Sequence, residues 1–364
     1  MSISEQDVIY LDRGFFTRTG YEEYYPLFDK FRTQYQSSSY EDKQKIIENV
    51  IDIYHNVKIF PMKYLGNNDI RDDLRSVSLS EVSIVDNVLS GRDISGLGAC
   101  RTLVPNISKA KGTGRGIKGE LDAFIESGLL YRTIKFILDN DESVYPNSVR
   151  RAMALTSGAV QNFPPSKSKS IYDKYCNKGD IVYDYSCGFG GRLVGSYATR
   201  KNLTYIGVEP NTETYSNLIN LDVECSKAYR VKNSRTKIYC TGSEDFVLDE
   251  NSVDFAFSSP PYFNKEVYSD DITQCYNKFP VYSDWLNYYV IPTMANIRRG
   301  LKPNKYVAVN IANNKKHSLY DDWLNASICL GFKLDHEIVM ELSKCGKSNR
   351  HDCEKIMVLK NIKN

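Results

Sequence analysis

Residues 181–191 read Ile-Val-Tyr-Asp-Tyr-Ser-Cys-Gly-Phe-Gly-Gly, and this stretch decides the fold of the second half of the chain. Its first three residues are β-branched or aromatic, which is typical of a buried strand, and a helical pattern begins near Arg192. Glycines at the intervening turn let the backbone pass close to a ligand, and they also suit a tightly packed turn. We therefore expect a strand, a turn and a helix here, with a ligand site or close packing at the glycines.

Further candidate strands follow, and they alternate with helical patterns. They lie at residues 205–208, 237–239, 253–257 and 306–311. Strands that alternate with helices indicate βαβ units and a parallel sheet. Two later runs, 333–342 and 355–359, are joined by a polar loop and suggest a closing antiparallel hairpin. The second half of the chain is therefore expected to be of the α/β class.

Glu209 directly follows the second of these strands, about 20 residues beyond the glycines. A carboxylate at that position commonly accepts hydrogen bonds from ribose hydroxyls, whereas the alternative is a solvated charge at a strand end. Nicotinamide enzymes and S-adenosylmethionine enzymes share this much. The glycine turn is not Gly-x-Gly-x-x-Gly, and a second motif follows at the fourth strand, which favours S-adenosylmethionine.

The second motif is Ser259-Pro260-Pro261-Tyr262, at the end of the strand at residues 253–257. Two prolines fix a rigid turn and remove two backbone donors, so carbonyl acceptors are left facing outward. The Ser259 hydroxyl and the Pro260 carbonyl can bind the hydrogens of an amino group. Tyr262 offers a face on which a base can stack. These four residues are the candidate catalytic residues, and Phe263 is a candidate base contact.

In these motifs the sequence resembles the amino-methyltransferases that modify N4 of cytosine or N6 of adenine in DNA, whose signature is Asp/Asn/Ser-Pro-Pro-Tyr/Phe/Trp. The resemblance extends from about Asn162 to Lys360. Asp184 to Gly190 is similar to the family's Asp-Pro-Phe-x-Gly-x-Gly, with Tyr185 in place of proline. The cofactor-binding residues that the family pattern implies are Pro165, Lys167, Asp184, Ser186, Gly188, Gly190 and Glu209, together with Ser243, Glu244 and Asp245 as competing contacts for adenine.

The resemblance implies a Rossmann-like, seven-stranded methyltransferase sheet with a closing antiparallel hairpin. It also implies methyl transfer from S-adenosylmethionine to an exocyclic amino group of a base flipped out of DNA. The serine form of the tetrapeptide favours N4 of cytosine over N6 of adenine. The alternatives are a methyltransferase of RNA amino groups, a non-methylating nucleic-acid-binding relative, and transfer of a group other than methyl.

Residues 1–158 are expected to form a mainly helical region, because apolar residues recur at helical spacing in 40–57 and 120–138. Such a region could recognise nucleic acid. Its candidate contacts lie in a glycine-spaced basic loop: Lys109, Lys111, Arg115 and Lys118. The alternative is a solvated surface loop. Residues 159–364 form the expected catalytic domain.

Composition narrows the class of protein only a little. The net charge of +2 gives no bulk attraction to nucleic acid, although it permits a local basic groove. With nine cysteines and no Cys-x-x-Cys pair, we expect a reducing, cytoplasmic setting and no membrane span. Cys345, His351 and Cys353 could hold a metal, but no fourth ligand is evident, so an ordinary hairpin tip without metal is expected.

Overall fold

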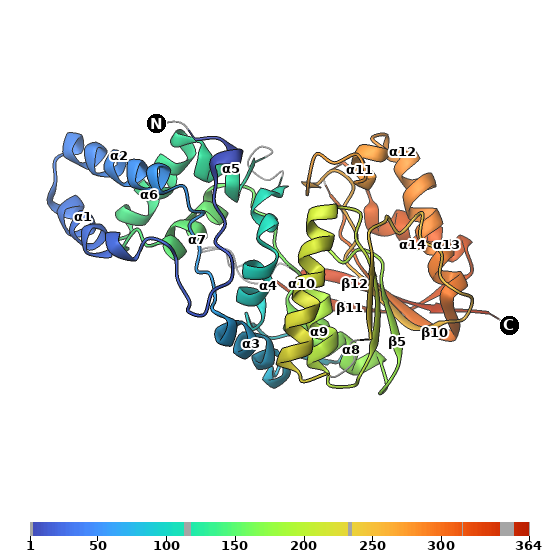
Figure 1. The fold of residues 1–364 in the computed structure, drawn as a ribbon. Coiled ribbons are helices and arrows are strands. Elements are labelled where there is room, and N and C mark those ends of the chain that lie inside the picture. The colour runs from blue at the N-terminus through green and yellow to red at the C-terminus, as the bar shows by residue number, and fades with distance from the viewer. Residues whose placement is uncertain (1–2, 113–117, 232–234, 315, 343–352, 364) are drawn as a thin grey trace. The chain divides into compact units, whose positions relative to one another are not determined.

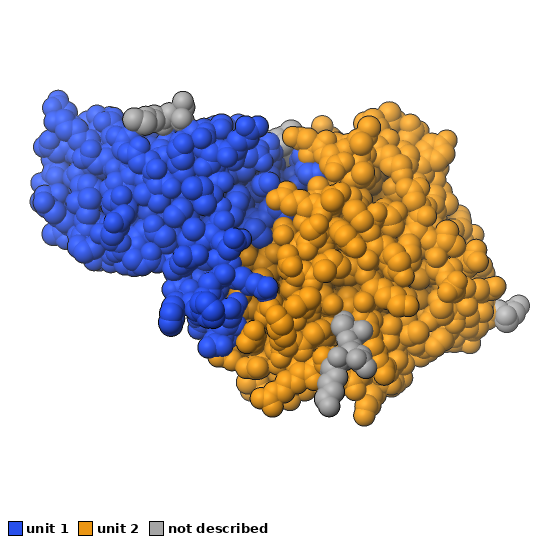
Figure 2. Space-filling model, viewed as in Figure 1, with its two compact units in different colours: residues 1–69, 105–161, 266–269 blue, residues 70–104, 162–265, 270–364 orange. Residues whose placement is uncertain are grey.

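The structure is a computed structural model, and it describes residues 3–112, 118–231, 235–314, 316–342 and 353–363. The chain divides into two compact units. Unit 1 comprises residues 1–69, 105–161 and 266–269, and unit 2 comprises residues 70–104, 162–265 and 270–364 (Figure 2).

Unit 1 is mainly helical, as expected, and buries one apolar core. Its helices are α1 (Tyr25–Ser37), α2 (Tyr40–Val57), α5 (Glu120–Ile125), α6 (Ser127–Asp139) and α7 (Pro146–Thr156), with short 3-10 turns at Glu5–Asp7, Glu22–Tyr24 and Pro105–Lys109. A three-stranded sheet joins β3 (Lys111–Gly112) to β4 (Lys118–Gly119) and β9 (Glu266–Val267). The periodicity over residues 40–57 predicted α2 with its observed ends. The helix begins after Ser39 because the Ser39 hydroxyl accepts from the Asp42 amide at 3.2 Å and caps the first turn.

The expected single helical stretch over residues 120–138 is wrong at one point. It is broken between α5 and α6 at Glu126, whose backbone is extended (φ −79°, ψ 108°). Glu126 also pairs with Lys118, and Gly128 follows it in the sequence. Two short helices therefore replace one long helix.

Unit 2 contains a nine-stranded sheet in the order β1-β2-β11-β12-β10-β8-β5-β6-β7. The strands are β1 (Ser83–Val85), β2 (Val88–Ser90), β5 (Ile181–Asp184), β6 (Thr204–Val208), β7 (Thr236–Tyr239), β8 (Val253–Ser258), β10 (Leu301–Asn310), β11 (Phe332–Glu341) and β12 (Cys353–Asn361). Strands β7, β6, β5, β8 and β10 are parallel, and β12 runs antiparallel to both β10 and β11. The α/β class and the closing hairpin are confirmed.

Helices cover both faces of this sheet (Figure 1). On one face lie α8 (Pro165–Tyr175), α9 (Gly191–Ala198) and α10 (Thr212–Ala228), and on the other lie α13 (Ile291–Gly300) and α14 (Leu319–Cys329). The remaining helices of this unit are α4 (Leu97–Leu103), α11 (Cys275–Lys278), α12 (Tyr282–Trp285), the 3-10 turn Val77–Leu79 and the π-helix Leu286–Val290, and α3 (Asn67–Ser76) begins in unit 1. Both faces are covered, and every residue of β8 is accordingly buried.

The first half of the chain differs from the expectations in two ways. The seven expected strands are present, and β2 pairs with β11 in parallel and adds the β1–β2 hairpin at that edge, so the sheet in the described residues has nine strands. A boundary at residue 158 assigned the whole of residues 1–158 to one region, yet residues 70–104 belong to unit 2. In the described part of the chain, no helix is both long enough and apolar enough to cross a membrane.

Candidate active site

The candidate residues gather at one edge of the sheet because parallel strands share their carboxyl ends. Asp184 ends β5, Glu209 follows β6, Ser243 and Glu244 follow β7, and Ser259 follows β8. In open α/β sheets this is the edge at which ligands bind.

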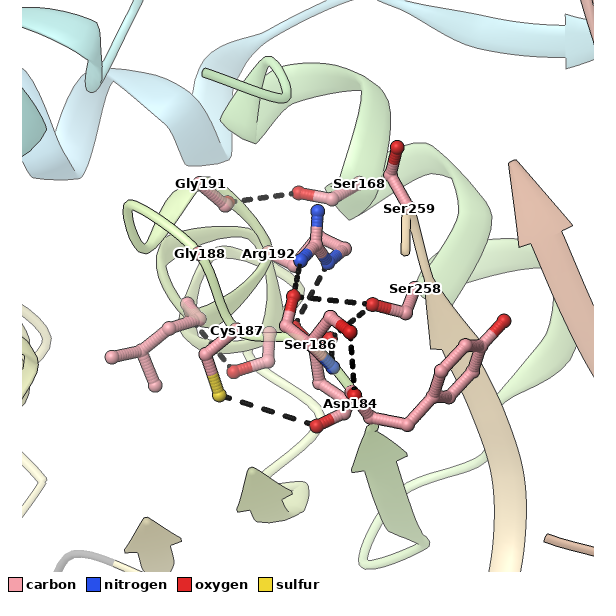
Figure 3. A network of polar contacts seen from close by, with 12 residues as sticks. Ser168, Asp184, Ser186, Cys187, Gly188, Gly191, Arg192, Ser258 and Ser259 are labelled. Carbon is pink, nitrogen blue, oxygen red and sulfur yellow. Dashed lines mark hydrogen bonds and ion pairs between the residues drawn. The ribbon is translucent and has the colours of Figure 1, made fainter. Parts of the chain in front are cut away.

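Asp184 lies at the centre of a buried polar network (Figure 3). It is fully buried, and its carboxylate forms an ion pair with Arg192 Nε at 2.9 Å. The hydroxyls of Tyr205 and Ser258 donate to it at 2.6 and 2.7 Å, and the Ser186 amide donates at 3.3 Å. The ion pair and these hydrogen bonds compensate the cost of burying the carboxylate. Asp184 therefore holds the turn after β5 in place by connecting it to β6 and β8.

The glycine turn is both closely packed and locally open. Gly190 has φ +84°, and a Cβ there would lie 2.3 Å from the Leu221 side chain, so it is a packing glycine. Gly188 has φ +54°, and a Cβ there would meet no atom closer than 3.9 Å. Gly188 therefore leaves space above the carboxyl end of β5, while Gly190 secures the turn against α10.

Glu209 faces this turn. Its carboxylate accepts hydrogen bonds from the Gly188 and Asn211 amides, each at 3.1 Å, and the residue is only 7% exposed. Burial raises the pKa of Glu209 to about 7, partly offset by the two amide donors. A carboxylate held here is poised to accept from hydroxyl groups of a ligand.

The loop after β7 separates the three competing candidates for the adenine contact. Ser243 is buried and its hydroxyl is hydrogen-bonded to Thr293 at 2.7 Å, while the exposed Asp245 pairs with Lys278. Lys278 also donates to Glu244 Oε1 at 3.1 Å, but Glu244 Oε2 is buried without a hydrogen-bond partner among the described residues. Burial raises the pKa of Glu244. Only Glu244 combines burial with a free acceptor.

Ser186 and Ser243 are linked by Tyr289, a residue that the sequence analysis did not single out. Its buried hydroxyl lies 3.3 Å from Ser186 Oγ, and Ser243 also hydrogen-bonds to it. Tyr289 lies in the π-helix Leu286–Val290, just before Pro292. A proline lacks the amide donor of a regular helix, and widened turns of this kind are common where a helix is interrupted.

The tetrapeptide forms the exit of β8. Ser259 is partly exposed, and its hydroxyl points away from the Asp184 network (Figure 3). Tyr262 is 8% exposed, and Lys265 Nζ lies 4.7 Å from its ring centroid. Phe263 is buried at φ +55° among the rings of Tyr282, Trp285 and His317. In this structure Phe263 packs the exit of β8 and presents little surface to a ligand.

Two polar residues that the sequence analysis also missed complete this corner. Asn310 ends β10, and its Nδ2 donates to Ser259 Oγ at 3.1 Å and to Tyr262 Oη at 3.3 Å. Tyr262 Oη in turn donates to Glu354 Oε2 on β12 at 3.3 Å. A polar residue at the carboxyl end of the expected strand 306–311 was a signal that could have pointed to Asn310. The partnership of Glu354 depends on sheet pairing and gave no such signal.

The segment before α8 packs against the glycine turn. Asn162 accepts from the Gly191 amide at 3.3 Å and donates to the Phe189 carbonyl at 2.8 Å. Pro165 and Lys167 are buried in the first turn of α8, and Lys167 Nζ donates to the Glu341 carbonyl. Burial lowers the pKa of Lys167. This segment therefore borders the site, but Lys167 is already held by the β11 end.

The candidate basic contacts lie in unit 1, and the described ones have acidic neighbours. Lys109 is 3.9 Å from Glu5, Lys111 is 3.8 Å from Asp122, and Lys118 pairs with Glu126. These carboxylates reduce the positive charge available to phosphates. Arg115 lies outside the described residues, as do Cys345 and His351.

No protein-family model and no curated protein matches the chain. Similar solved structures include an S-adenosylmethionine-dependent O-methyltransferase from Thermotoga maritima (15% identity, TM-score 0.38, 56% of this chain and 68% of that one). A TehB-like methyltransferase from Corynebacterium glutamicum (14%, 0.35, 56% and 91%) and the cyclase SpnF (11%, 0.39, 54% and 80%) are similar to the same degree. At these values the likenesses carry no argument about the reaction, and the α/β assignment rests on strand order and register.

Proposed function

We propose that the chain is an S-adenosylmethionine-dependent methyltransferase that acts on an exocyclic amino group of a base in DNA, with N4 of cytosine favoured over N6 of adenine. One observation carries the proposal. The buried carboxylate of Glu209 and the turn from Ser259 to Tyr262 lie at the same carboxyl edge of the sheet, after β6 and β8.

The residues present fit the cofactor. Glu209 would accept from the ribose hydroxyls, and the unpartnered Glu244 Oε2 would accept from the adenine amino group. A Cβ at Gly188 would meet no atom closer than 3.9 Å, so the cofactor could approach the backbone of the turn there. S-adenosylmethionine, when bound, supplies an electrophilic methyl group. Asp184 and Arg192 would act indirectly, by fixing the turn that carries Ser186 and Gly188.

The turn after β8 would hold the target amine. The Ser259 hydroxyl and the Pro260 carbonyl would accept its two hydrogens, which localises the nitrogen lone pair, and Tyr262 would stack on the base. Such catalysis depends on positioning and preorganised dipoles, so it needs no strong general base. Tyr262 already carries Lys265 over one ring face, so the base would use the other face.

The choice of DNA and of cytosine rests on the tetrapeptide. Its serine form is more frequent among the N4-cytosine enzymes of the family that the sequence resembles. An RNA amino-methyltransferase has a similar Pro-Pro-aromatic turn, so transfer to RNA is the main competing outcome.

Ser259→Ala tests the assignment through methyl transfer to DNA and to RNA with a radiolabelled cofactor. The variant should lose transfer by about 100-fold while keeping cofactor affinity, because one preoriented group is removed. Ser252→Ala is the control, since Ser252 lies at the opposite end of β8, where its hydroxyl donates to the Asp249 carbonyl. If Ser259→Ala remained as active as Ser252→Ala, the assignment would be wrong.

A further inference from the structure

We propose that Asn310 and Glu354 recognise the target amine: Asn310 Oδ1 shares with the Ser259 hydroxyl one of its two hydrogens, the Pro260 carbonyl accepts the other, and Glu354 holds the Asn310 amide in the orientation that this requires. This inference rests on the proposed function. It adds Asn310 on β10 and Glu354 on β12 to the amine-binding residues of the proposed function, all of which lie in the turn after β8.

Sheet pairing places Asn310 beside the tetrapeptide. In the parallel register Val309 pairs with Ser258, so the next residues, Asn310 and Ser259, leave their strands side by side. Their side chains meet at 3.1 Å. Asn310 is 3% exposed, whereas Ser259 is partly exposed.

The two ends of the Asn310 amide are unequally used. Nδ2 faces three oxygens: Ser259 Oγ, Tyr262 Oη and Glu354 Oε2, the last at 3.4 Å. Oδ1 is buried and has no hydrogen-bond partner among the described residues. A buried acceptor without a partner has lost its hydrogen bonds to water and gained none in return. A donor supplied by a ligand would compensate that loss.

Glu354 determines which end of the amide is left over. An ionised carboxylate only accepts hydrogen bonds, so it favours the orientation in which Nδ2 faces Glu354 and Oδ1 faces away. Tyr262 Oη also donates to Glu354, which completes a closed arrangement. The atom left without a partner, Asn310 Oδ1, is therefore an acceptor. An amino group of a base can donate to it, whereas a carbonyl oxygen of a base would be repelled by it.

The site thus selects by chemistry at one atom. A base with an amino group, such as cytosine or adenine, supplies the missing donor. Uracil or hypoxanthine presents a carbonyl oxygen at the same position and leaves Oδ1 unpartnered. Asn310 is in this account a base-contacting residue, and Glu354 is a positioning residue.

The test changes the protein and the target base separately and together: Asn310 is replaced by Leu, and the amino group of the base is replaced by a carbonyl oxygen. Binding is measured for an oligonucleotide that carries the unmodified target base. It is measured again for the same oligonucleotide with uracil replacing a cytosine target or hypoxanthine replacing an adenine target. The wild-type protein should bind the amino form about tenfold more tightly. Asn310→Leu should bind both forms alike and should lower kcat by at least about tenfold, with cofactor affinity unchanged.

Asn361→Leu is a matched control. Asn361 is also fully buried in the same sheet, on β12, and its Oδ1 also has no partner among the described residues. Its Nδ2 donates to the Leu301 and Arg298 carbonyls, far along the strand from Glu354. Asn361→Leu should keep the tenfold preference even if it lowers stability. Loss of the preference in both variants would assign it to general destabilisation and overturn the inference.

Glu354→Gln provides a second variant that keeps side-chain volume. A glutamine can accept from or donate to Asn310, so the amide is no longer held in one orientation. The preference for the amino form should fall, and cofactor affinity should not. An unchanged preference in Asn310→Leu or in Glu354→Gln, with methyl transfer by the wild type intact, would refute the inference alone. If the wild type transferred no methyl group to nucleic acid, the proposed function itself would fail.

Discussion

Glu209 illustrates how burial and hydrogen bonding act together on a single residue. Burial raises the pKa of its carboxyl to about 7, and two backbone amides oppose that shift. The ionised form is the better acceptor for ribose hydroxyls. Below pH 7 the carboxyl binds a proton, so a ligand that needs the carboxylate binds more weakly as the pH falls.

This gives a prediction with a defined sign. The affinity of 5′-methylthioadenosine, which has no group that titrates between pH 6 and 8, should rise by about tenfold between pH 6 and pH 8. In Glu209→Gln the affinity should be lower and should not depend on pH. Calorimetry at both pH values checks this. Equal pH dependence in the two proteins would remove Glu209 from the ribose site.

The turn between β5 and α9 is the element that was predicted most fully from the sequence. It begins with Asp184 and passes two glycines with different tasks, one packed and one open. A substitution at the packed glycine forces two costs together, a positive φ and a clash with Leu221.

Gly190→Ala should therefore destabilise the protein more than Gly179→Ala. Both glycines have φ +84°, but a Cβ at Gly179 would meet nothing within 4 Å. Gly179→Ala should cost about 1–2 kcal/mol from backbone conformation alone, and Gly190→Ala about 1–3 kcal/mol more. Urea unfolding of the two variants measures the difference. Equal midpoints would show that Leu221 moves aside freely and that the turn is not packed as described.

Periodicity and strand–helix alternation located the parallel strands, the closing hairpin and α2, because these elements are long and strongly patterned. Strands β1 and β2 could not be predicted in this way, since strands of three residues carry almost no pattern. The break at Glu126, where the backbone is extended, lies within a continuous apolar pattern and therefore left no signal in the sequence.

The site residues that directly follow a strand in the sequence could be predicted. Those that are brought together by the pairing of distant strands could not. Ser259 and Glu209 lie directly after their strands. Glu244 emerges from three adjacent candidates only through the contacts of its neighbours. Glu354 reaches Tyr262 because β12 pairs with β10, a relation between distant segments that no local pattern contains.

At the scale of the whole molecule, the mainly helical unit is the candidate for nucleic-acid recognition. Its contribution to the affinity for nucleic acid would come from lysines whose charge is partly neutralised by Glu5, Asp122 and Glu126. If Lys111 and Lys118 contact phosphates, replacing both by Gln should weaken DNA binding and reduce the slope of log affinity against log salt by about 2.

Lys45→Gln is the control for that measurement, because Lys45 lies in the same unit and pairs with Asp42. Fluorescence anisotropy over a range of salt concentrations reports the slopes. An unchanged slope in the double variant would assign these lysines to a solvated surface loop, which is the simpler interpretation of a charged loop.

The central claim is methyl transfer to a base amino group, and mass spectrometry of nucleosides tests it most directly. DNA incubated with the protein and S-adenosylmethionine carrying a deuterated methyl group is digested to nucleosides. The account predicts N4-methylcytosine, or N6-methyladenine, carrying that label. Label on a ring carbon, on RNA alone, or on no nucleoside at all would contradict it.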